Sequence, residues 1–543
     1  MVFARRSTTL LAAIIASCAM VLSLTACTSD NKTVVDGQTT VTSNSAGGVA
    51  VFTPSDGITL NQQTPLNKWA KLVPDLAKAL ADAGFKKGDI DHTTSDSLAK
   101  QSRAIQDFVV DHLSNNTTDD SGIAIAPDNM TLLVAPVVEA DASTRQYGDC
   151  ISQNLSTNDA TDGEATSDGE SSEDDSSKDD SSNTESDSTA SDEQAQAVDR
   201  LVSSLKLAKE SGMHVVLLGN SIEGYKPDAF VKFSDAQTIG KLQAEKMVSK
   251  LKLDKASKDN PKYIEVLLPY TAMDEKGNAN DSTFAQEAFR GIWQVLGSYY
   301  QKGVVESPSG TLDGKSTEND WQAVAYDAAK EGSTAKVLDK RLAKTDGQST
   351  LTRIDGIITM NDYIASEVVK ELDDLGYTGS AADINPQITI SGIVGNITGK
   401  KDLSRDAVPD PIKSPENDNA NDSSSSDDDA DEDTSASDKD RDSQWPLVTG
   451  YGAYVSNIPS IVNGKQWMTG MEDRQTIATD IAQACAKLNK DEALNSMPSI
   501  RNSEVGGVKK IPTISEPLLA VSASNLKSAL IDPGYISLAD AGL

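Results

Sequence analysis

Apolar residues along this chain occur in two alternating patterns. The first is a short, continuous, β-branched run of the kind that forms strands buried on both faces. Such runs lie at residues 48–53, 131–138, 215–218, 263–268, 354–360 and 388–393. The second is recurrence at helical spacing, found at residues 69–80, 98–113, 198–212, 284–296, 321–344, 364–375 and 476–488. Strands that alternate with helices predict parallel β-α-β units and therefore an α/β fold.

The strand–helix unit from Ile354 to Gly376 shows this alternation most clearly. Its apolar run is followed by the polar dipeptide Asn361-Asp362, before apolar residues recur at helical spacing. In an open parallel sheet the loops after the strands face the ligand crevice, so we expect this dipeptide to lie there. Asp362 would then contact a solute, and Asp362→Ala would weaken binding while leaving folding largely intact. The alternative is that Asp362 merely caps the following helix.

The acidic charge of the chain is concentrated in two segments. The 543 residues carry a formal net charge of -33, and most of it lies in two Ser/Asp/Glu-rich inserts at about 154–193 and about 411–442. Such runs cannot bury an apolar core, so we expect both inserts to be disordered. The rest of the chain is only moderately acidic, which argues against nucleic-acid binding because that function needs a basic face.

The N-terminal residues are typical of a bacterial lipoprotein signal. A pair of arginines precedes an apolar run that is short for a membrane span, and Leu24-Thr25-Ala26-Cys27 looks like a lipobox. We therefore expect a signal peptide at 1–26 and a lipid anchor at Cys27 on the extracellular face of the cell membrane. A flexible tether at 27–47 would follow.

Two further cysteines, Cys150 and Cys485, lie in the expected mature chain. An oxidising exterior permits a disulfide between them. Cys485 lies inside an apolar-periodic helix, however, and this position favours a buried free thiol.

Several local segments resemble the substrate-binding proteins of sugar ABC transporters, of the type that includes the xylose- and ribose-binding proteins. The strand that ends in Asn361-Asp362, with Ala365 in the following helix, is a recurrent feature of the second lobe of that family. Other segments fall in the family's order and at its spacing. They are Phe233-Ser234-Asp235 with Gly240 and Gln243-Ala244, Asn463-Gly464-Lys465-Gln466 with Met468-Thr469, and Lys510 to Ile514 with Asn525 and Gly534-Tyr535.

The resemblance implies two Rossmann-like lobes with parallel sheets joined by a three-strand hinge, the periplasmic-binding-protein-like I fold. The N-terminal lobe would comprise residues 48–232 and about 470–511, and the C-terminal lobe residues 233–469 and about 512–543. It also implies that the chain, as a monomer, binds a sugar between the lobes and delivers it to an ABC permease in the membrane.

Sugar sites of this family offer polar groups to the hydroxyls and an aromatic face to the ring. The resemblance implies that Trp69 and Trp321 stack on the solute. For each tryptophan, core packing is the competing interpretation. For Asp235 and Gln466, which lie at inferred crossovers between the lobes, the competing role is to fix the hinge by hydrogen bonds. The implied polar contacts are Asn220, Asp235, Asn361, Asp362 and Gln466.

The sequence also departs from the family at positions of the expected site. Gly219-Asn220 stand where an Asp-Arg pair is usual, Ala236 where an Asn is usual, and Val394 where an Asp is usual. The Asp-Asn-Asn run expected before the helix at Ala285 is blurred. An uncharged or partly apolar solute, or a weakened site, therefore stays open.

The sequence contains no pattern that indicates catalysis. Its histidines, His92, His112 and His214, lack metal-ligand spacing, and neither a phosphate-binding loop nor a nucleophile elbow is present. We therefore expect no enzymatic activity, no cofactor and no metal. Two alternatives to transport stay open: a sugar-sensing lipoprotein that signals to a membrane receptor, and a non-transport surface protein with a degenerate site.

Overall fold

The computed structural model describes residues 46–55, 65–115, 125–138, 145–149, 151–156, 184–273, 280–343, 351–381 and 442–543. The predicted signal peptide, nearly all of the tether and most of both acidic inserts lie outside the described residues. So do Cys27, Cys150, Val394 and the strand predicted at 388–393. Among the helices that the structure describes, none is long and apolar enough to cross a membrane.

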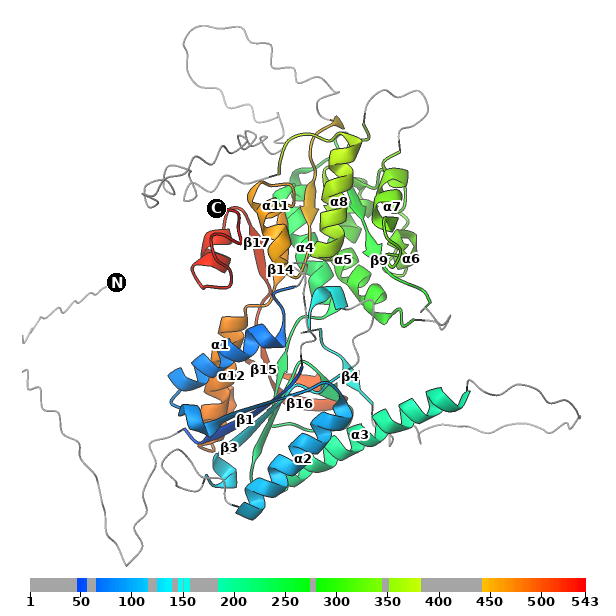
Figure 1. The fold of residues 1–543 in the computed structure, drawn as a ribbon. Helices are drawn as coiled ribbons and strands as arrows, with labels where there is room; N and C mark the ends of the chain where they lie inside the picture. The colour runs from blue at the N-terminus through cyan, green and yellow to red at the C-terminus, as the bar shows by residue number, and fades with distance from the viewer. Residues whose placement is uncertain are drawn as a thin grey trace, which may run out of the picture. The chain divides into compact units, whose positions relative to one another are not determined.

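A seven-stranded sheet forms the centre of the N-terminal lobe, hereafter the N lobe (Figure 1). The strand order is β15-β16-β7-β5-β3-β1-β2, and neighbours pair in parallel except β15 and β16. The strands are β1 (Gly48–Pro54), β2 (Ile90–Ser95), β3 (Met130–Val134), β5 (His214–Leu218), β7 (Ala229–Lys232), β15 (Ile500–Val505) and β16 (Val508–Ser515).

Two pairs of helices cover the N-lobe sheet. Helix α1 (Trp69–Asp82) packs on α12 (Arg474–Leu488), and α2 (Leu98–Asn115) packs on α3 (Thr184–Glu210), with one pair on each side of the sheet in Figure 1. Strand β1 shows why: Val49 and Val51 pack under α1 and α12, whereas Ala50 and Phe52 pack under α2 and α3. A strand buried on both faces needs the continuous apolar run seen in the sequence.

Cys485 lies in α12 and belongs to the core beneath that helix. It is a buried free thiol, as its place in an apolar-periodic helix predicted.

A four-stranded parallel sheet, in the order β10-β8-β12-β13, forms the centre of the C-terminal lobe, hereafter the C lobe. Its strands are β8 (Lys262–Val266), β10 (Val305–Glu306), β12 (Gly356–Ile358) and β13 (Leu447–Thr449). Helices α4 (Ala236–Lys250) and α5 (Thr283–Gln301) share one apolar core with this sheet. Helices α7 (Ser333–Arg341) and α8 (Asp362–Leu375) share another.

Two glycines allow α4 and α5 to approach backbone to backbone. A Cβ atom on Gly240 would lie 2.2 Å from the carbonyl oxygen of Ala288, and one on Gly291 would lie 2.0 Å from that of Gln237. Any larger residue at either position would push the two helices apart, so this contact requires glycine at both.

Three chain segments connect the lobes, in agreement with the predicted three-strand hinge. They follow β7, β14 (Met468–Met471) and β16, and the last leads into β17 (Leu519–Ser522), which pairs antiparallel with β14. All described residues belong to one unit, Ser45–Leu543. The N-lobe boundary placed at about 511 lies at Ser515 instead, because β16 pairs with β7 up to that residue.

Short elements complete the fold. Strand β4 (Asn154–Leu155) pairs with β6 (Ser221–Ile222), and β9 (Leu268–Pro269) pairs with β11 (Ala325–Tyr326). The remaining helical elements are α6 (Trp321–Val324), α11 (Ile458–Val462), the π-helical η9 (Lys527–Ile531), and the 3-10 turns η1 (Lys87–Asp89), η2 (Pro127–Asn129), η3 (Arg145–Tyr147), η5 (Leu253–Lys255), η7 (Val455–Asn457) and η8 (Leu494–Ser496).

Some elements differ from those the sequence predicted. Strand β3 stops at Val134, close before Pro136, which has no N–H for a sheet ladder. The helical stretch expected at 321–344 is divided, because β11 separates α6 from α7. The first insert is shorter than predicted, because β4 covers its first residues and α3 begins at Thr184.

Candidate functional site

Asp362 lies at the carboxyl end of β12, where the sequence placed it, and is the first residue of α8. Its side chain is fully buried. Oδ1 accepts a hydrogen bond from Gln466 Nε2 (2.7 Å), and Oδ2 accepts from the backbone N–H of Tyr454 (2.9 Å) and from Thr469 Oγ1 (2.9 Å). The carboxylate thus ties α8 to the loop after β13 and to the crossover strand β14.

These contacts bear on two predictions about Asp362. We expect Asp362→Ala to lower the stability of the fold, because it would leave several buried donors without an acceptor. Contact between Asp362 and a solute stays a prediction. The alternative that Asp362 merely caps α8 is wrong. The residue that caps α8 is Asn361, whose Oδ1 accepts from the backbone N–H of Ile364 (2.9 Å).

Asn361 connects the two lobes. Its Nδ2 donates to Oε1 of Gln146 (3.1 Å), a residue of η3 that follows β3 along the chain. Tyr454, in the loop after β13, donates its hydroxyl to the backbone carbonyl of the same Gln146 (2.6 Å). The strand ends of the C lobe are therefore hydrogen-bonded to a segment of the N lobe.

Gln466 is buried beside Asp362 and shares its network. Its Nε2 also donates to the carbonyl oxygen of Met468 (3.1 Å), and its Oε1 accepts from Asn457 Nδ2 (2.8 Å). Of the seven predicted site residues, the structure brings Asn361, Asp362 and Gln466 together. For Gln466, the contacts support the alternative that it fixes the crossover by hydrogen bonds.

The other two polar candidates lie in the N lobe and at its first crossover. Asn220 follows β5; its Nδ2 donates to the carbonyl oxygen of Pro136 (2.9 Å), and its Oδ1 accepts from the backbone N–H of Gln153 (2.9 Å). Asp235 caps α4 by accepting from the backbone N–H of Thr238 (2.7 Å), and its Oδ2 lies 2.9 Å from Lys232 Nζ. Solute contact by either residue stays a prediction.

The two predicted stacking residues each begin a helix and are buried. Trp69, at the start of α1, packs edge to face on Phe233 with 5.7 Å between ring centroids. Trp321, at the start of α6, packs edge to face on Tyr270 at 5.1 Å. These contacts support the core-packing interpretation, and stacking on a solute stays untested for both.

Glu472 is a crossover residue that the sequence reading missed. It is buried directly after β14, and its Oε1 accepts from the backbone N–H of Ser234 (2.7 Å) and from the hydroxyls of Ser234 and Tyr451. Ser234 lies in the first crossover and Glu472 in the second, so this carboxylate joins the two. The available signal was an acidic pair, Glu472-Asp473, at the end of an apolar crossover strand.

Burial raises the pKa of the carboxyl groups of Asp362 and Glu472. Hydrogen bonds to the charged form act in the opposite direction, yet the pKa of Asp362 is raised to about 6 and that of Glu472 to about 6. Both values exceed the ordinary 3.8 and 4.5 of these groups. The folded state therefore binds more protons than the unfolded state between about pH 4 and pH 6.

We expect Glu472→Gln to reduce the loss of stability that the protein shows as the pH rises. The stabilisation from the raised pKa of Glu472 is complete below the unfolded pKa and is lost as the pH passes through about 6. It amounts to about 2 kcal/mol. A glutamine retains an oxygen that accepts from Ser234, but it does not titrate. The melting temperature of the Glu472→Gln variant should therefore fall less than that of the wild type between pH 5 and pH 7.5.

The matched control is Glu245→Gln, on the exposed part of α4, which should follow the wild-type pH profile. His92 and His112, whose pKa values are lowered by burial, act in the opposite direction, but they are present in all three proteins. Parallel pH profiles for the wild type and Glu472→Gln would contradict the prediction.

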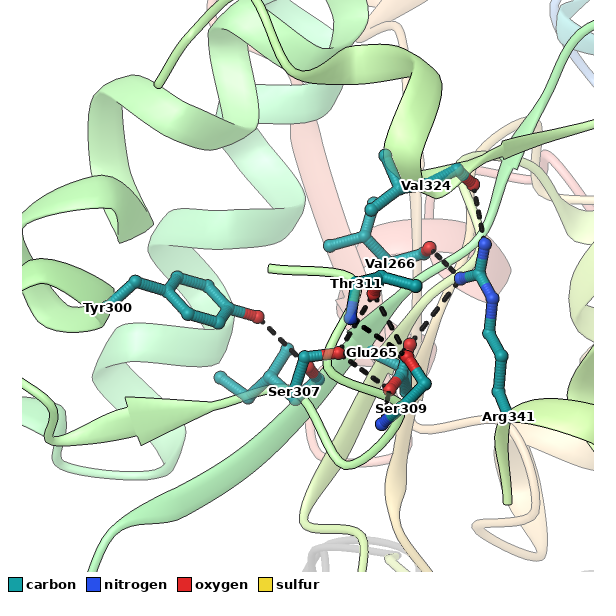
Figure 2. Close-up of polar contacts among 9 residues, drawn as sticks. Glu265, Val266, Tyr300, Ser307, Ser309, Thr311, Val324 and Arg341 are labelled. Atoms are coloured by element: carbon teal, nitrogen blue, oxygen red, sulfur yellow. Dashed lines mark hydrogen bonds and ion pairs between the residues drawn. The ribbon is translucent and has the colours of Figure 1, made fainter. Parts of the chain in front are cut away.

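A second buried polar cluster, also missed from the sequence, lies on β8 of the C lobe (Figure 2). Glu265 is fully buried, and its Oε1 accepts from Ser307 Oγ (2.7 Å) and from the backbone N–H of Ser309 (2.8 Å). Its Oε2 lies 3.4 Å from Nη1 of Arg341. Figure 2 shows Arg341 approaching Glu265 from the side opposite Ser307. A charged residue inside an apolar strand was the sequence signal for this ion pair.

Two further features bear on alternative sites. Among the described residues, no group of His, Cys, Asp or Glu side chains could hold a metal ion. A hollow of about 610 Å³ lies in the N lobe between α12 and the β15–β16 hairpin, with Leu488, Arg501 and Pro512 in its wall. None of the seven predicted site residues lines it.

No family model matches the chain, and no curated protein matches it. Among solved structures, it is similar to an ABC transporter solute-binding protein from Clostridium phytofermentans with bound β-D-glucose (17% identity; 91% of this chain and 99% of that chain covered; TM-score 0.43). It is also similar to a carbohydrate transporter solute-binding protein from Chloroflexus aurantiacus in complex with D-glucose (18%; 92% and 98%; 0.43). A third is a periplasmic ribose ABC transporter from Conexibacter woesei (14%; 90% and 96%; 0.43).

Proposed function

We propose that this chain is a lipid-anchored solute-binding protein that binds an uncharged carbohydrate between its lobes and delivers it to an ABC permease. The observation that carries the proposal is the hydrogen bond between Asn361 and Gln146. It joins the carboxyl end of a C-lobe strand to the segment after an N-lobe strand, which is where a parallel sheet presents a ligand crevice.

The chemistry around this contact supports a polar, uncharged solute. The amide of Asn361 and the hydroxyl of Tyr454 are hydrogen-bonding groups without net charge, and the ring of Phe284 lies close by, 4.7 Å from that of Tyr147. Amides, hydroxyls and aromatic rings are the groups that recognise sugar hydroxyls and ring faces.

The test is a thermal-shift screen of the full chain against a panel of mono- and oligosaccharides, followed by calorimetry. A bound sugar should raise the melting temperature, and the rise should grow with the sugar concentration. At a sugar concentration of a hundred times Kd, binding adds about 2.7 kcal/mol to the free energy of unfolding. Asn361→Ser should still fold, because serine also caps helices, but it should bind the same sugar more weakly because it lacks the amide.

One observation favours the alternative of a surface protein with a degenerate site. The side chains of Asn220, Asp235, Asp362 and Gln466 all have hydrogen-bond partners within the chain. A screen in which no sugar shifts the melting temperature would support this alternative and contradict the proposed function.

Lipid anchoring is tested separately through Cys27. Cys27→Ala should release the protein from the membrane fraction, because the lipobox cysteine is the residue that would carry the lipid. Cys18→Ala is the matched control, since it changes another cysteine of the same N-terminal segment and should leave anchoring intact. Labelling of Cys27→Ala by a fatty acid would contradict the assignment.

A further inference from the structure

The segment Gln146–Asp149, which follows β3 of the N lobe, is fixed to that lobe at one end. Asp149 accepts hydrogen bonds from Lys68 Nζ (2.7 Å) and from the backbone N–H of Trp69 (3.2 Å), and its own N–H donates to the carbonyl oxygen of Asn67 (2.8 Å). Gly148 has a φ of +100°, and a Cβ there would lie 2.4 Å from the same carbonyl oxygen. The close approach to the start of α1 therefore requires glycine.

The other end of the segment contacts the C lobe. Gln146 accepts hydrogen bonds from Asn361 Nδ2 at its side chain and from the Tyr454 hydroxyl at its backbone carbonyl. Asn361 follows β12 and Tyr454 follows β13, so both partners lie at carboxyl ends of the C-lobe sheet. The segment therefore spans from the N lobe to the C-lobe strand ends.

Between these two anchors, Tyr147 packs into the C lobe. Its side chain is only 1% exposed and belongs to the apolar core shared by α4, α5 and the C-lobe sheet. Its ring centroid lies 4.7 Å from that of Phe284 and 6.2 Å from that of Tyr451. An aromatic ring from the N-lobe chain thus fills space against aromatic rings of the C lobe.

We propose that Gln146–Asp149 is a built-in occupant of the crevice, which a solute must displace before it reaches Asn361; this inference rests on the proposed function. A solute that closes two lobes does so by contacting both, and this segment already contacts both. The segment also places a hydrogen-bonding amide against Asn361 and an aromatic ring against Phe284. A bound sugar would offer hydroxyls and a ring face to the same two residues. The segment and the solute then compete for the same place. The apparent affinity for the solute becomes weaker as the segment is seated in a larger fraction of the molecules.

The test uses full-length Tyr147→Ala and Gln146→Ala, with Tyr299→Ala as the control. Tyr299 carries a ring on α5 whose hydroxyl bonds Asp254 (2.6 Å), outside the segment's contacts. With the sugar that gives the largest shift in the panel, both segment variants should bind more tightly, by up to about tenfold for a segment seated in about nine molecules of ten. The control should match the wild type.

Hydrogen exchange provides a second readout on the same proteins. In the wild type, the amides of Gln146 and Tyr147 should exchange faster when the sugar is added, because displacement removes Tyr147 from the C-lobe core. The amide of Asp149 should stay protected, because its acceptor Asn67 lies in the N lobe. Weaker binding by Gln146→Ala or Tyr147→Ala, or slower exchange of the segment in the sugar complex, would overturn the proposal, since the segment would then belong to the solute site.

The outcomes also separate this inference from the proposed function. If no sugar binds any of the proteins, the carbohydrate assignment fails. Amide hydrogen exchange measured without sugar then tests whether the segment is seated in the crevice. Amides protected in the wild type and released in Gln146→Ala would support a seated occupant. Amides that exchange freely in both proteins would overturn it.

Discussion

Replacing Asp362 with alanine is expected to lower the free energy of unfolding by about 3 kcal/mol. The change removes the acceptor for Gln466 Nε2, Thr469 Oγ1 and the backbone N–H of Tyr454, all of which are buried. Each unsatisfied donor costs about 1–3 kcal/mol, and relief from burying a carboxyl group with a raised pKa offsets part of the sum. Urea unfolding at pH 7 measures the difference.

Asp373→Ala is the matched control for this prediction. Asp373 is an aspartate of the same helix, but its side chain is 53% exposed and pairs with Lys465 at the surface. Removing such a pair costs at most about 1 kcal/mol. Equal unfolding midpoints for Asp362→Ala and Asp373→Ala would show that the buried network does not stabilise the crossover.

Arg341→Met is expected to destabilise the C lobe by about 3–5 kcal/mol, because it leaves Glu265 buried and uncompensated. The guanidinium does more than pair with that carboxylate, since it also donates to the backbone of the sheet and of α6. Its acceptors there are the carbonyl oxygens of Val266 (2.5 Å) and Val324 (2.9 Å).

The measurement is denaturant unfolding followed by tryptophan fluorescence, which reports on the C lobe through Trp293, Trp321 and Trp445. Adding Glu265→Gln to Arg341→Met should recover much of the loss, because glutamine still accepts from Ser307 without a charge. Lys527→Met, at an exposed pair with Asp532, should cost less than about 1 kcal/mol. A double variant no more stable than Arg341→Met would show that charge burial is not the cause.

The strands and helices with strong patterns could be predicted from the sequence, and β2 shows where that approach fails. Central strands such as β5 carry an apolar side chain at nearly every position because both of their faces are buried. Strand β2, at the edge of the sheet, is mostly exposed and reads as a polar loop. Its place follows from pairing with β1, which no local pattern encodes.

The candidate site was predictable only in part, for a similar reason. Asn361-Asp362 could be placed because a strand and a helix with clear periodicity flank them. Gln146 and Tyr147 lie in a short turn after β3, between residues with no repeating pattern. Their partners are more than 100 positions away in the sequence, so the contact exists only once both lobes have folded.

The strand order of the N lobe has a consequence for the chain as it is synthesised. Strand β7 ends at Lys232, and its outer neighbour in the sheet, β16, begins only at Val508. Until the ribosome has made nearly the whole protein, the first lobe therefore presents an open sheet edge, which is prone to pair with other chains. An N-terminal fragment should consequently aggregate rather than fold, and a binding partner that shields nascent chains would have to hold this edge until the last strands arrive.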